Sequence, residues 1–262
     1  MKLDLTGKTA VVTGAGRGIG LAVAQALVRE GVSVAAGSLN TSAELTALAD
    51  DGDLTVVLDD LTTTAGCQAL VDAAVGEFGG IDILVNNVGG VRPRTEGFVE
   101  VTDADWLWAL DVNLLSAVRA TRAAVPHLLE RAPAAITTIC SVNATLPDPG
   151  VIDYSAAKAA LHSFCKSLSK ELGPAGVRVN TVSPGPVETA LWLGAGGVAE
   201  TVGKARGLDP AAVRQAAVSG TPTGRFTRPT EVAELVLFLS SAAAGNMTGA
   251  DVLIDGGMVS TI

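Results

Sequence analysis

The chain has 262 residues, of which 48% are hydrophobic, and its 27 acidic against 18 basic residues give a net charge of −9. This length and apolar content allow one large core, so we expect a single domain over residues 1–262. The negative charge repels phosphate backbones and anionic lipid headgroups, which argues against a nucleic-acid or membrane-surface partner.

No apolar run approaches the length of a membrane span, and the start MKLDLTGK lacks the layout of a signal peptide. We therefore expect a cytoplasmic protein. Cys67, Cys140 and Cys165 are odd in number and without CxxC pairing, and His127 and His162 add no metal pattern. The sequence predicts structural thiols and no bound metal.

Short apolar runs alternate with longer amphipathic stretches along almost the whole chain. This alternation is typical of crossover units in a parallel sheet covered by helices on both faces. It predicts a doubly wound α/β fold of about seven mainly parallel strands. The expected strands are 9–13, 32–36, 54–58, 81–85, 134–139, 177–182 and 251–254. The expected helices are 18–30, 42–50, 63–78, 103–130, 153–172 and 229–242.

One segment, 184–224, departs from this alternation because it is rich in Gly and Pro. Long irregular segments in compact domains are often functional, so we expect a substrate-covering loop at about 186–224. A plain surface excursion is the alternative.

The glycine-rich stretch TAVVTGAGRGIG leads from the first strand into the first helix. Glycines at such a turn let the backbone approach a pyrophosphate, whose charge then meets the free N–H groups of the helix start. A tight turn without a ligand is the alternative, but the strand-to-helix context favours dinucleotide binding.

The stretch YSAAK holds Tyr154, the only tyrosine of the chain, four positions before Lys158. Residues four apart on a helix share one face. A phenol titrates at about pH 10, and a nearby ammonium favours the phenolate, so this pair is a tunable proton donor and acceptor. Ser141 lies 13 residues before Tyr154 at a strand end, and Asn113 lies in the preceding long helix.

The spacing of TGxxxGxG and YxxxK, together with NNVG at 86–89, SPGPVET at 183–189 and IDGG at 254–257, resembles the short-chain dehydrogenase/reductase family over nearly the whole chain. The resemblance implies a Rossmann-like fold and hydride transfer between a nicotinamide cofactor and a ketone or secondary alcohol. It implies that Ser141 hydrogen-bonds the substrate carbonyl and that Tyr154 delivers the proton. Lys158 then lowers the pKa of Tyr154 and holds the nicotinamide ribose, and Asn113 positions a water that relays protons.

The resemblance also assigns a set of residues to the cofactor. Ser38 stands where NAD-using members carry Asp, so NADP(H) is favoured, with Arg17 available for its 2′-phosphate. NAD(H) remains the alternative, since Leu39 stands where many NADP(H) users place an arginine. The assigned residues are Gly14, Arg17, Gly18, Ile19, Gly20, Ser38, Asp60, Asn87, Gly89, Tyr154, Lys158, Pro184, Gly185, Val187 and Thr189.

The expected substrate region is mostly apolar, comprising Val91, Asn143 to Leu146, and Leu191 to Leu193, with Arg92 and Arg94 as candidates to bind an acidic substrate group. Relatives in the family commonly form tetramers, so we expect a homotetramer. The leading hypothesis is an NADP(H)-dependent carbonyl reductase. An NAD-dependent alcohol dehydrogenase and a non-catalytic NAD(P)-sensing regulatory protein are the alternatives.

Overall fold

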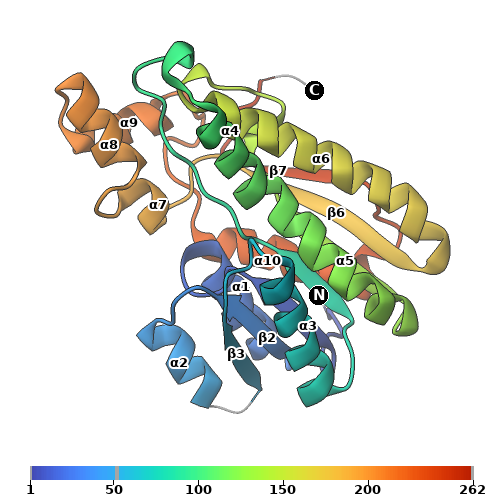
Figure 1. Cartoon of the computed structure of the whole chain (residues 1–262). Helices are drawn as coiled ribbons and strands as arrows, with labels where there is room; N and C mark the ends of the chain where they lie inside the picture. The colour runs from blue at the N-terminus through green and yellow to red at the C-terminus, as the bar shows by residue number, and fades with distance from the viewer. Residues whose placement is uncertain (1, 51–52, 261–262) are drawn as a thin grey trace.

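The computed structural model describes residues 2–50 and 53–260, and its centre is one seven-stranded sheet in which all strands run parallel (Figure 1). The strand order is β3-β2-β1-β4-β5-β6-β7. The predicted doubly wound parallel sheet is thus confirmed. The strands are β1 (Thr9–Thr13), β2 (Ser33–Ser38), β3 (Leu54–Leu58), β4 (Ile83–Asn86), β5 (Ala134–Ile139), β6 (Val177–Pro184) and β7 (Asp251–Ile254).

The order of the strands reverses beside β1, which is the feature that positions the site. Val12 of β1 pairs with Ala36 of β2 on one side and with Val85 of β4 on the other. Chain segments leaving β1 and β4 turn toward opposite faces of the sheet, and a crevice opens between them at the carboxyl ends.

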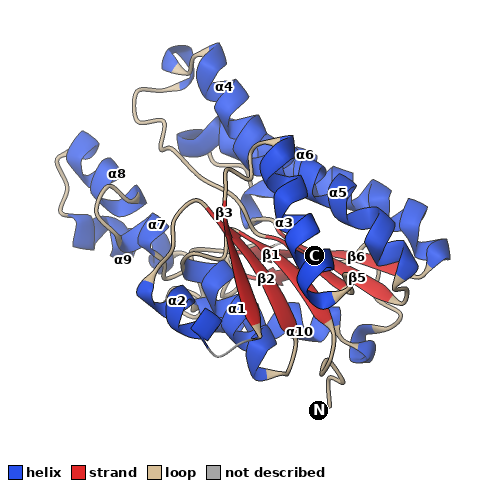
Figure 2. Ribbon diagram, turned by 60° about the horizontal axis from the view of Figure 1, so that its bottom comes forward, coloured by secondary structure: helices blue, strands red, loops and turns tan. Residues whose placement is uncertain are grey.

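Helices cover both faces of the sheet in two layers (Figure 2). Helices α1 and α10 pack with the core that contains Leu27 and Val236, whereas α3, α5 and α6 pack with the core that contains Leu70 and Leu161. None of the helices among the described residues is both long and apolar enough to cross a membrane. Their bounds are α1 (Gly18–Arg29), α2 (Ala43–Asp50), α3 (Thr64–Phe78), α4 (Asp103–Leu110), α5 (Ser116–Glu130), α6 (Ile152–Leu172), α7 (Ala190–Leu193), α8 (Val198–Arg206), α9 (Pro210–Ser219) and α10 (Pro229–Ser240).

The long helix predicted over 103–130 is interrupted. A π-helical turn, Asp111–Leu115, separates α4 from α5, and the hydroxyl of Ser116 donates to the carbonyl oxygen of Val112 at 2.6 Å. Periodicity does not reveal such a turn, because both flanking segments keep an ordinary helical pattern. π-Turns inside helices are frequent at functional sites.

The segment expected to be irregular is mostly helical. It folds into α7, α8 and α9, a helical insert (residues 190–219) that stands apart from the sheet in Figure 1. Most of its glycines and its single proline lie at or between helix ends: Gly207 ends α8 in the left-handed region at φ 64°, and Pro210 begins α9 after its N-cap Asp209. Gly203 is the exception, because it lies within α8. Proline at the first helical position and glycine just past the last favour these boundaries, so this composition supports short helices.

Candidate functional site

A cavity of about 1040 Å³ opens at the carboxyl ends of the strands. The segments that follow β1, β2, β4, β5 and β6 form its walls, and residues of the helical insert line one side. All but one of the residues proposed for the cofactor or for chemistry line this cavity: Gly14, Arg17, Gly18, Ile19, Ser38, Asp60, Asn87, Gly89, Asn113, Ser141, Tyr154, Lys158, Pro184, Gly185, Val187 and Thr189. The exception is Gly20, which lies in the same turn but is not among the lining residues.

The turn after β1 has a shape that only glycine permits. Gly14 and Gly18 lie at φ 69° and 58°, the left-handed region. A Cβ on Gly20 would collide with the carbonyl oxygen of Gly14, and a Cβ on Gly16 would collide with the hydroxyl of Ser38. The turn therefore keeps its backbone bare toward the cavity, so that a flat or charged group can approach it closely.

The start of α1 is free to bind an anion. Its N-cap residue, Arg17, is extended and makes no side-chain cap hydrogen bond, and the first turn has no acidic residue. The first N–H groups of a helix lack intrahelical partners and carry the positive end of its dipole. Together with the bare glycine turn, this fits the pyrophosphate of a dinucleotide.

Thr13 and Asn87 join the glycine turn to the segment after β4. The amide of Asn87 donates through Nδ2 to the carbonyl oxygens of Thr13 and Gly14, each at 3.0 Å. In return, the hydroxyl of Thr13 accepts from the backbone N–H groups of Asn87 at 2.9 Å and Val88 at 3.2 Å. These four bonds fix the width of the crevice.

At the adenine end expected for a dinucleotide, the residues are Ser38 and Asp60. The Ser38 hydroxyl donates to the carbonyl oxygen of Asn40 at 2.8 Å. Oδ1 of Asp60 accepts from the backbone N–H and the hydroxyl of Thr62, and these bonds lower the pKa of the Asp60 carboxyl. Asp60 is therefore an anion that can accept hydrogen bonds at the rim of the cavity.

Asn113 lies in the π-turn and is completely buried. Its Oδ1 accepts from the backbone N–H of Gly90 at 3.0 Å, and its Nδ2 donates to the carbonyl oxygens of Gly90 at 2.8 Å and Ala109 at 3.0 Å. The Asn113 side chain thus holds the loop after β4 against the helix. The bonded residue of that loop, Gly90, directly follows the predicted cofactor residue Gly89.

Ser141, Tyr154 and Lys158 meet where β5 ends and α6 begins. Nζ of Lys158 donates to the carbonyl oxygen of Ile139 at 2.9 Å and lies 5.8 Å from the centre of the Tyr154 ring. The hydroxyl of Ser141 donates to Oδ1 of Asn143 at 3.2 Å and accepts from its backbone N–H at 3.2 Å. Lys158 is only 3% exposed.

Burial controls the protonation of this pair. Burial raises the pKa of Tyr154 to about 12, and a hydrogen bond with Ser141 opposes the shift. Burial also lowers the pKa of Lys158. The pKa of Tyr154 is thus raised, whereas its lysine neighbour was expected to lower it. The reason is that burial of a titratable group penalises its charged form. At neutral pH the phenol keeps its proton and is available as an acid.

The segment after β6 covers the glycine turn. The backbone N–H of Gly185 donates to the carbonyl oxygen of Ile254 at 3.1 Å, which ties this segment to β7. A Cβ on Gly18 would lie 3.2 Å from Cγ2 of Thr189, so the threonine lies directly over the turn.

Arg92 and Arg94, expected as candidates for an acidic substrate group, are held elsewhere and do not line the cavity. Nη1 of Arg94 lies 2.9 Å from Oδ1 of Asp105, and its Nε and Nη2 donate to Oδ2 of the buried Asp153. Arg92 stacks on Trp108, 3.8 Å from the ring centre. The physical reason is that nearby carboxylates and an aromatic face already satisfy both guanidinium groups.

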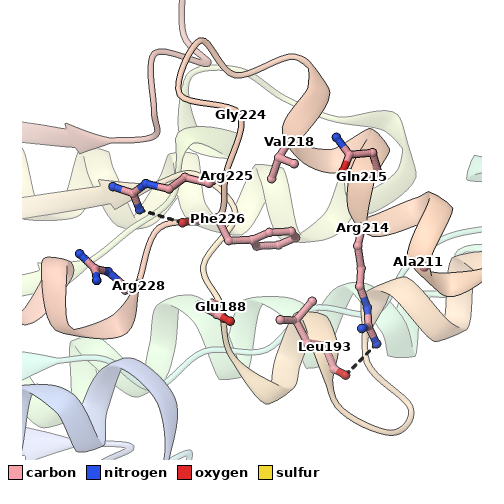
Figure 3. A pocket seen from close by; sticks show the side chains of 10 residues that line it. All are labelled: Glu188, Leu193, Ala211, Arg214, Gln215, Val218, Gly224, Arg225, Phe226 and Arg228. Carbon is pink, nitrogen blue, oxygen red and sulfur yellow. Dashed lines mark hydrogen bonds between the residues drawn. The ribbon is translucent and has the colours of Figure 1, made fainter.

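The structure also shows residues that the sequence analysis missed. Asp153 immediately precedes Tyr154, and its ion pair with Arg94 fixes the start of α6. Of the expected substrate region, Val91, Asn143, Leu146, Leu191 and Trp192 line the cavity, whereas Ala144 and Thr145 are not among its lining residues. Leu193 instead lines a second pocket of about 580 Å³ on the other side of α9 (Figure 3). Further lining residues come from the helical insert: Val198, Val202, Arg206, Val213, Ala216 and Ala217.

Known proteins resemble this chain along its length. A family model described as enoyl-(acyl carrier protein) reductase matches residues 14–259. The 3-oxoacyl-(acyl-carrier-protein) reductase FabG of Vibrio cholerae is 33% identical over 259 residues, which are 98% of this chain and 99% of that protein. The oxidoreductase UcpA of Salmonella typhimurium is 35% identical over 260 residues, 97% of this chain and 95% of that protein. The structure of L-sorbose reductase from Gluconobacter frateurii, complexed with NADPH and L-sorbose, has a TM-score of 0.90 at 32% identity and full coverage of both chains.

The ion pair beside Tyr154 generates a stability prediction. Replacing Arg94 by Met leaves the carboxylate of Asp153, whose side chain is 2% exposed, without its partner. Breaking a buried pair in this way costs about 3–5 kcal/mol, which urea denaturation followed by circular dichroism measures. Arg92→Met is the control and is expected to cost less than about 1 kcal/mol, because its stacking on Trp108 is largely exposed. Equal losses in the two variants would contradict the assignment.

Proposed function

The chain belongs to the short-chain dehydrogenase/reductase family of NAD(P)-dependent oxidoreductases, and we propose that it is an NADPH-dependent carbonyl reductase acting on ketones, with oxidation of the secondary alcohol as the reverse reaction. The observation that carries the proposal is that Asn113, Ser141, Tyr154 and Lys158 line the same cavity as the glycine turn. A cofactor fixed by that turn and a substrate held at the tyrosine then share one enclosed space.

The proposed chemistry is a hydride and a proton added across a carbonyl group. The bound nicotinamide supplies the hydride to the carbonyl carbon. Ser141 donates a hydrogen bond to the carbonyl oxygen, in exchange for its bond to Asn143, and stabilises the negative charge that develops there. The phenol of Tyr154 gives its proton to that oxygen, and its high pKa supports this role because the phenol is protonated at neutral pH.

Lys158 and Asn113 support the proton donor. Once Tyr154 has lost its proton, the ammonium of Lys158 stabilises the phenolate. Ile139 holds that ammonium in place through its carbonyl oxygen. We assign to Asn113 the positioning of a water that returns a proton toward Lys158. Its two bonds to Gly90 support this assignment, since they hold the π-turn next to the lysine.

A preference for NADP(H) is part of the proposal. Ser38 ends β2 without a carboxylate that would repel a 2′-phosphate, and Asn40, Thr41 and Ser42 continue the cavity wall with polar groups. Within the described residues, the guanidinium of Arg17 has no hydrogen-bond or ion-pair partner, although it lines the same cavity. A free guanidinium suits a phosphate monoester. An NAD-dependent alcohol dehydrogenase is the alternative.

We further propose a cytoplasmic homotetramer. Leu107 of α4, Leu115 of the π-turn and Leu129 of α5 are large apolar side chains exposed to solvent. Burying them against a second copy would remove apolar surface from water, which favours association.

The proposed cytoplasmic location is supported by the cysteines. The three buried free thiols suit a reducing compartment.

The reductase activity is tested by the loss of NADPH absorbance across a panel of ketones, diketones and β-ketoesters. Tyr154→Phe is expected to lower kcat/KM by roughly 10²–10⁴-fold, because it removes the general acid. NADPH binding, followed by cofactor fluorescence, is the control and should persist. Turnover that survives in Tyr154→Phe would reject the proposed acid, and tight cofactor binding without turnover of any ketone or alcohol would favour the sensor.

The cofactor preference is tested by Arg17→Gln, which removes the charge while the extended backbone of this residue stays compatible with glutamine. The variant is expected to weaken NADPH binding by about tenfold, because a charge-assisted bond to the 2′-phosphate is lost. NADH lacks that phosphate, so its Kd is expected to be unchanged. Equal changes for both cofactors, or tighter binding of NADH by the unaltered protein, would overturn the preference.

The proposed assembly is tested by multi-angle light scattering at micromolar concentration. The expected mass corresponds to four chains. Leu107→Gln combined with Leu115→Gln is expected to shift the population to smaller species, because both exposed leucines then become polar. A stable monomer of the unaltered protein would refute the tetramer.

A further inference from the structure

The part of the cavity beyond Tyr154 has an apolar wall that ends in one cation. The charged side chains that line the whole cavity are Arg17, Asp60, Asp148, Lys158 and Arg206. Arg17 and Asp60 belong to the glycine turn and the β3 end, and Lys158 lies beside Tyr154. Asp148 accepts a hydrogen bond from the N–H of Gly150 through Oδ1. Arg206 is therefore the cation that remains for a substrate among the described lining residues.

Arg206 faces the cavity because of its place on α8. Val198, Val202 and Arg206 are spaced four apart, so they share one face of the helix, and all three line the cavity. The two valines present an apolar surface, and the guanidinium follows at the far end. The rise from the first to the last of these residues is about 12 Å. This face suits a molecule with an apolar stretch and a terminal negative charge.

The end of α8 is well fixed, so the backbone of Arg206 has a defined place at the cavity, while its side chain is exposed to solvent. Gly207 ends the helix in the left-handed region, and the N–H of Leu208 donates to the carbonyl oxygen of Gly203 at 2.9 Å. The side chain of Arg206 itself has no hydrogen-bond or ion-pair partner within residues 2–50 and 53–260. This distinguishes it from Arg94, which Asp105 and Asp153 hold.

We propose that Arg206 is an anion-binding subsite, and that the substrate is an oxo acid whose carboxylate lies at the Arg206 end while its ketone lies at Tyr154. Arginine matches the planar carboxylate through two parallel hydrogen bonds. This inference rests on the proposed reductase function, and it replaces the assignment of an acidic-group site to Arg92 and Arg94.

The experiment compares straight-chain methyl-ketone acids of increasing length, beginning with levulinate, with their methyl esters. NADPH-dependent kcat/KM is measured for each acid and ester with the unaltered protein and with Arg206→Gln. We expect the acids of suitable length to be preferred, and we expect Arg206→Gln to lower their kcat/KM by about tenfold, as for the loss of a hydrogen bond to a charged group. The esters should be unaffected, and Arg206→Lys should keep part of the preference.

Lys204→Gln is the matched control. It removes the same charge from the same helix, two residues away, and Lys204 does not line the cavity. It should leave both acids and esters unchanged, whereas an equal loss in Lys204→Gln would mean that the net charge of the helix, not a subsite, attracts the acids.

Failure of this inference is distinguishable from failure of the proposed function. Tyr154-dependent reduction of esters and acids at equal rates, or an equal loss for both in Arg206→Gln, would overturn the subsite and leave the reductase intact. If no ketone is reduced, the reductase fails. The Kd of the acids and esters then decides the subsite alone. It is measured by the change in tryptophan fluorescence, to which Trp192 in the cavity wall responds, with a Trp192→Phe variant identifying its share. The subsite requires that the acids bind more tightly than the esters and lose this advantage in Arg206→Gln.

Discussion

The reversal of strand order between β1 and β4 is the constraint on which the rest of the site depends. Because β1 and β4 are neighbours and the chain segments that follow them leave toward opposite faces of the sheet, a crevice opens between the carboxyl ends of these two strands. Thr13 and Asn87 bridge the opening with four hydrogen bonds to the adjoining backbone. The crevice is thereby kept open at a fixed width, with bare glycine backbone on one wall.

Burial sets the chemical state of the groups that enter this crevice from β5 and α6. Lys158 is tied to the carbonyl of Ile139, and Tyr154 is partly buried, which raises the pKa of its phenol. The phenol of Tyr154 is therefore protonated at neutral pH and available to donate its proton. The buried ion pair of Asp153 and Arg94 anchors the helix start immediately before the tyrosine, so the position of the phenol depends on a loop that follows β4.

The helical insert forms one side of the cavity. Most of its glycines and its single proline lie at or between helix ends, and they permit three short helices within 30 residues of chain, from 190 to 219. One face of α8 and one face of α9 turn toward the cavity, while the opposite face of α9 borders the second pocket, where Arg214 donates to the carbonyl oxygen of Leu193 (Figure 3). Residues on a single short helix therefore separate two differently lined spaces.

The sequence by itself determined the parallel sheet and most element bounds, because period, turn glycines and capping residues are local properties. Because strand ends in a parallel sheet share one edge, the sequence also indicated most of the residues that line the cavity, although Gly20, Arg92, Arg94 and Leu193 do not line it. Tertiary structure alone decided the π-turn at Asn113, the ion pair of Arg94 with Asp153 and the direction of the Tyr154 pKa shift. Each of these features depends on which groups from distant segments come into contact and on how far those groups are buried. The spacing of residues along the chain does not reveal either the contacts or the burial.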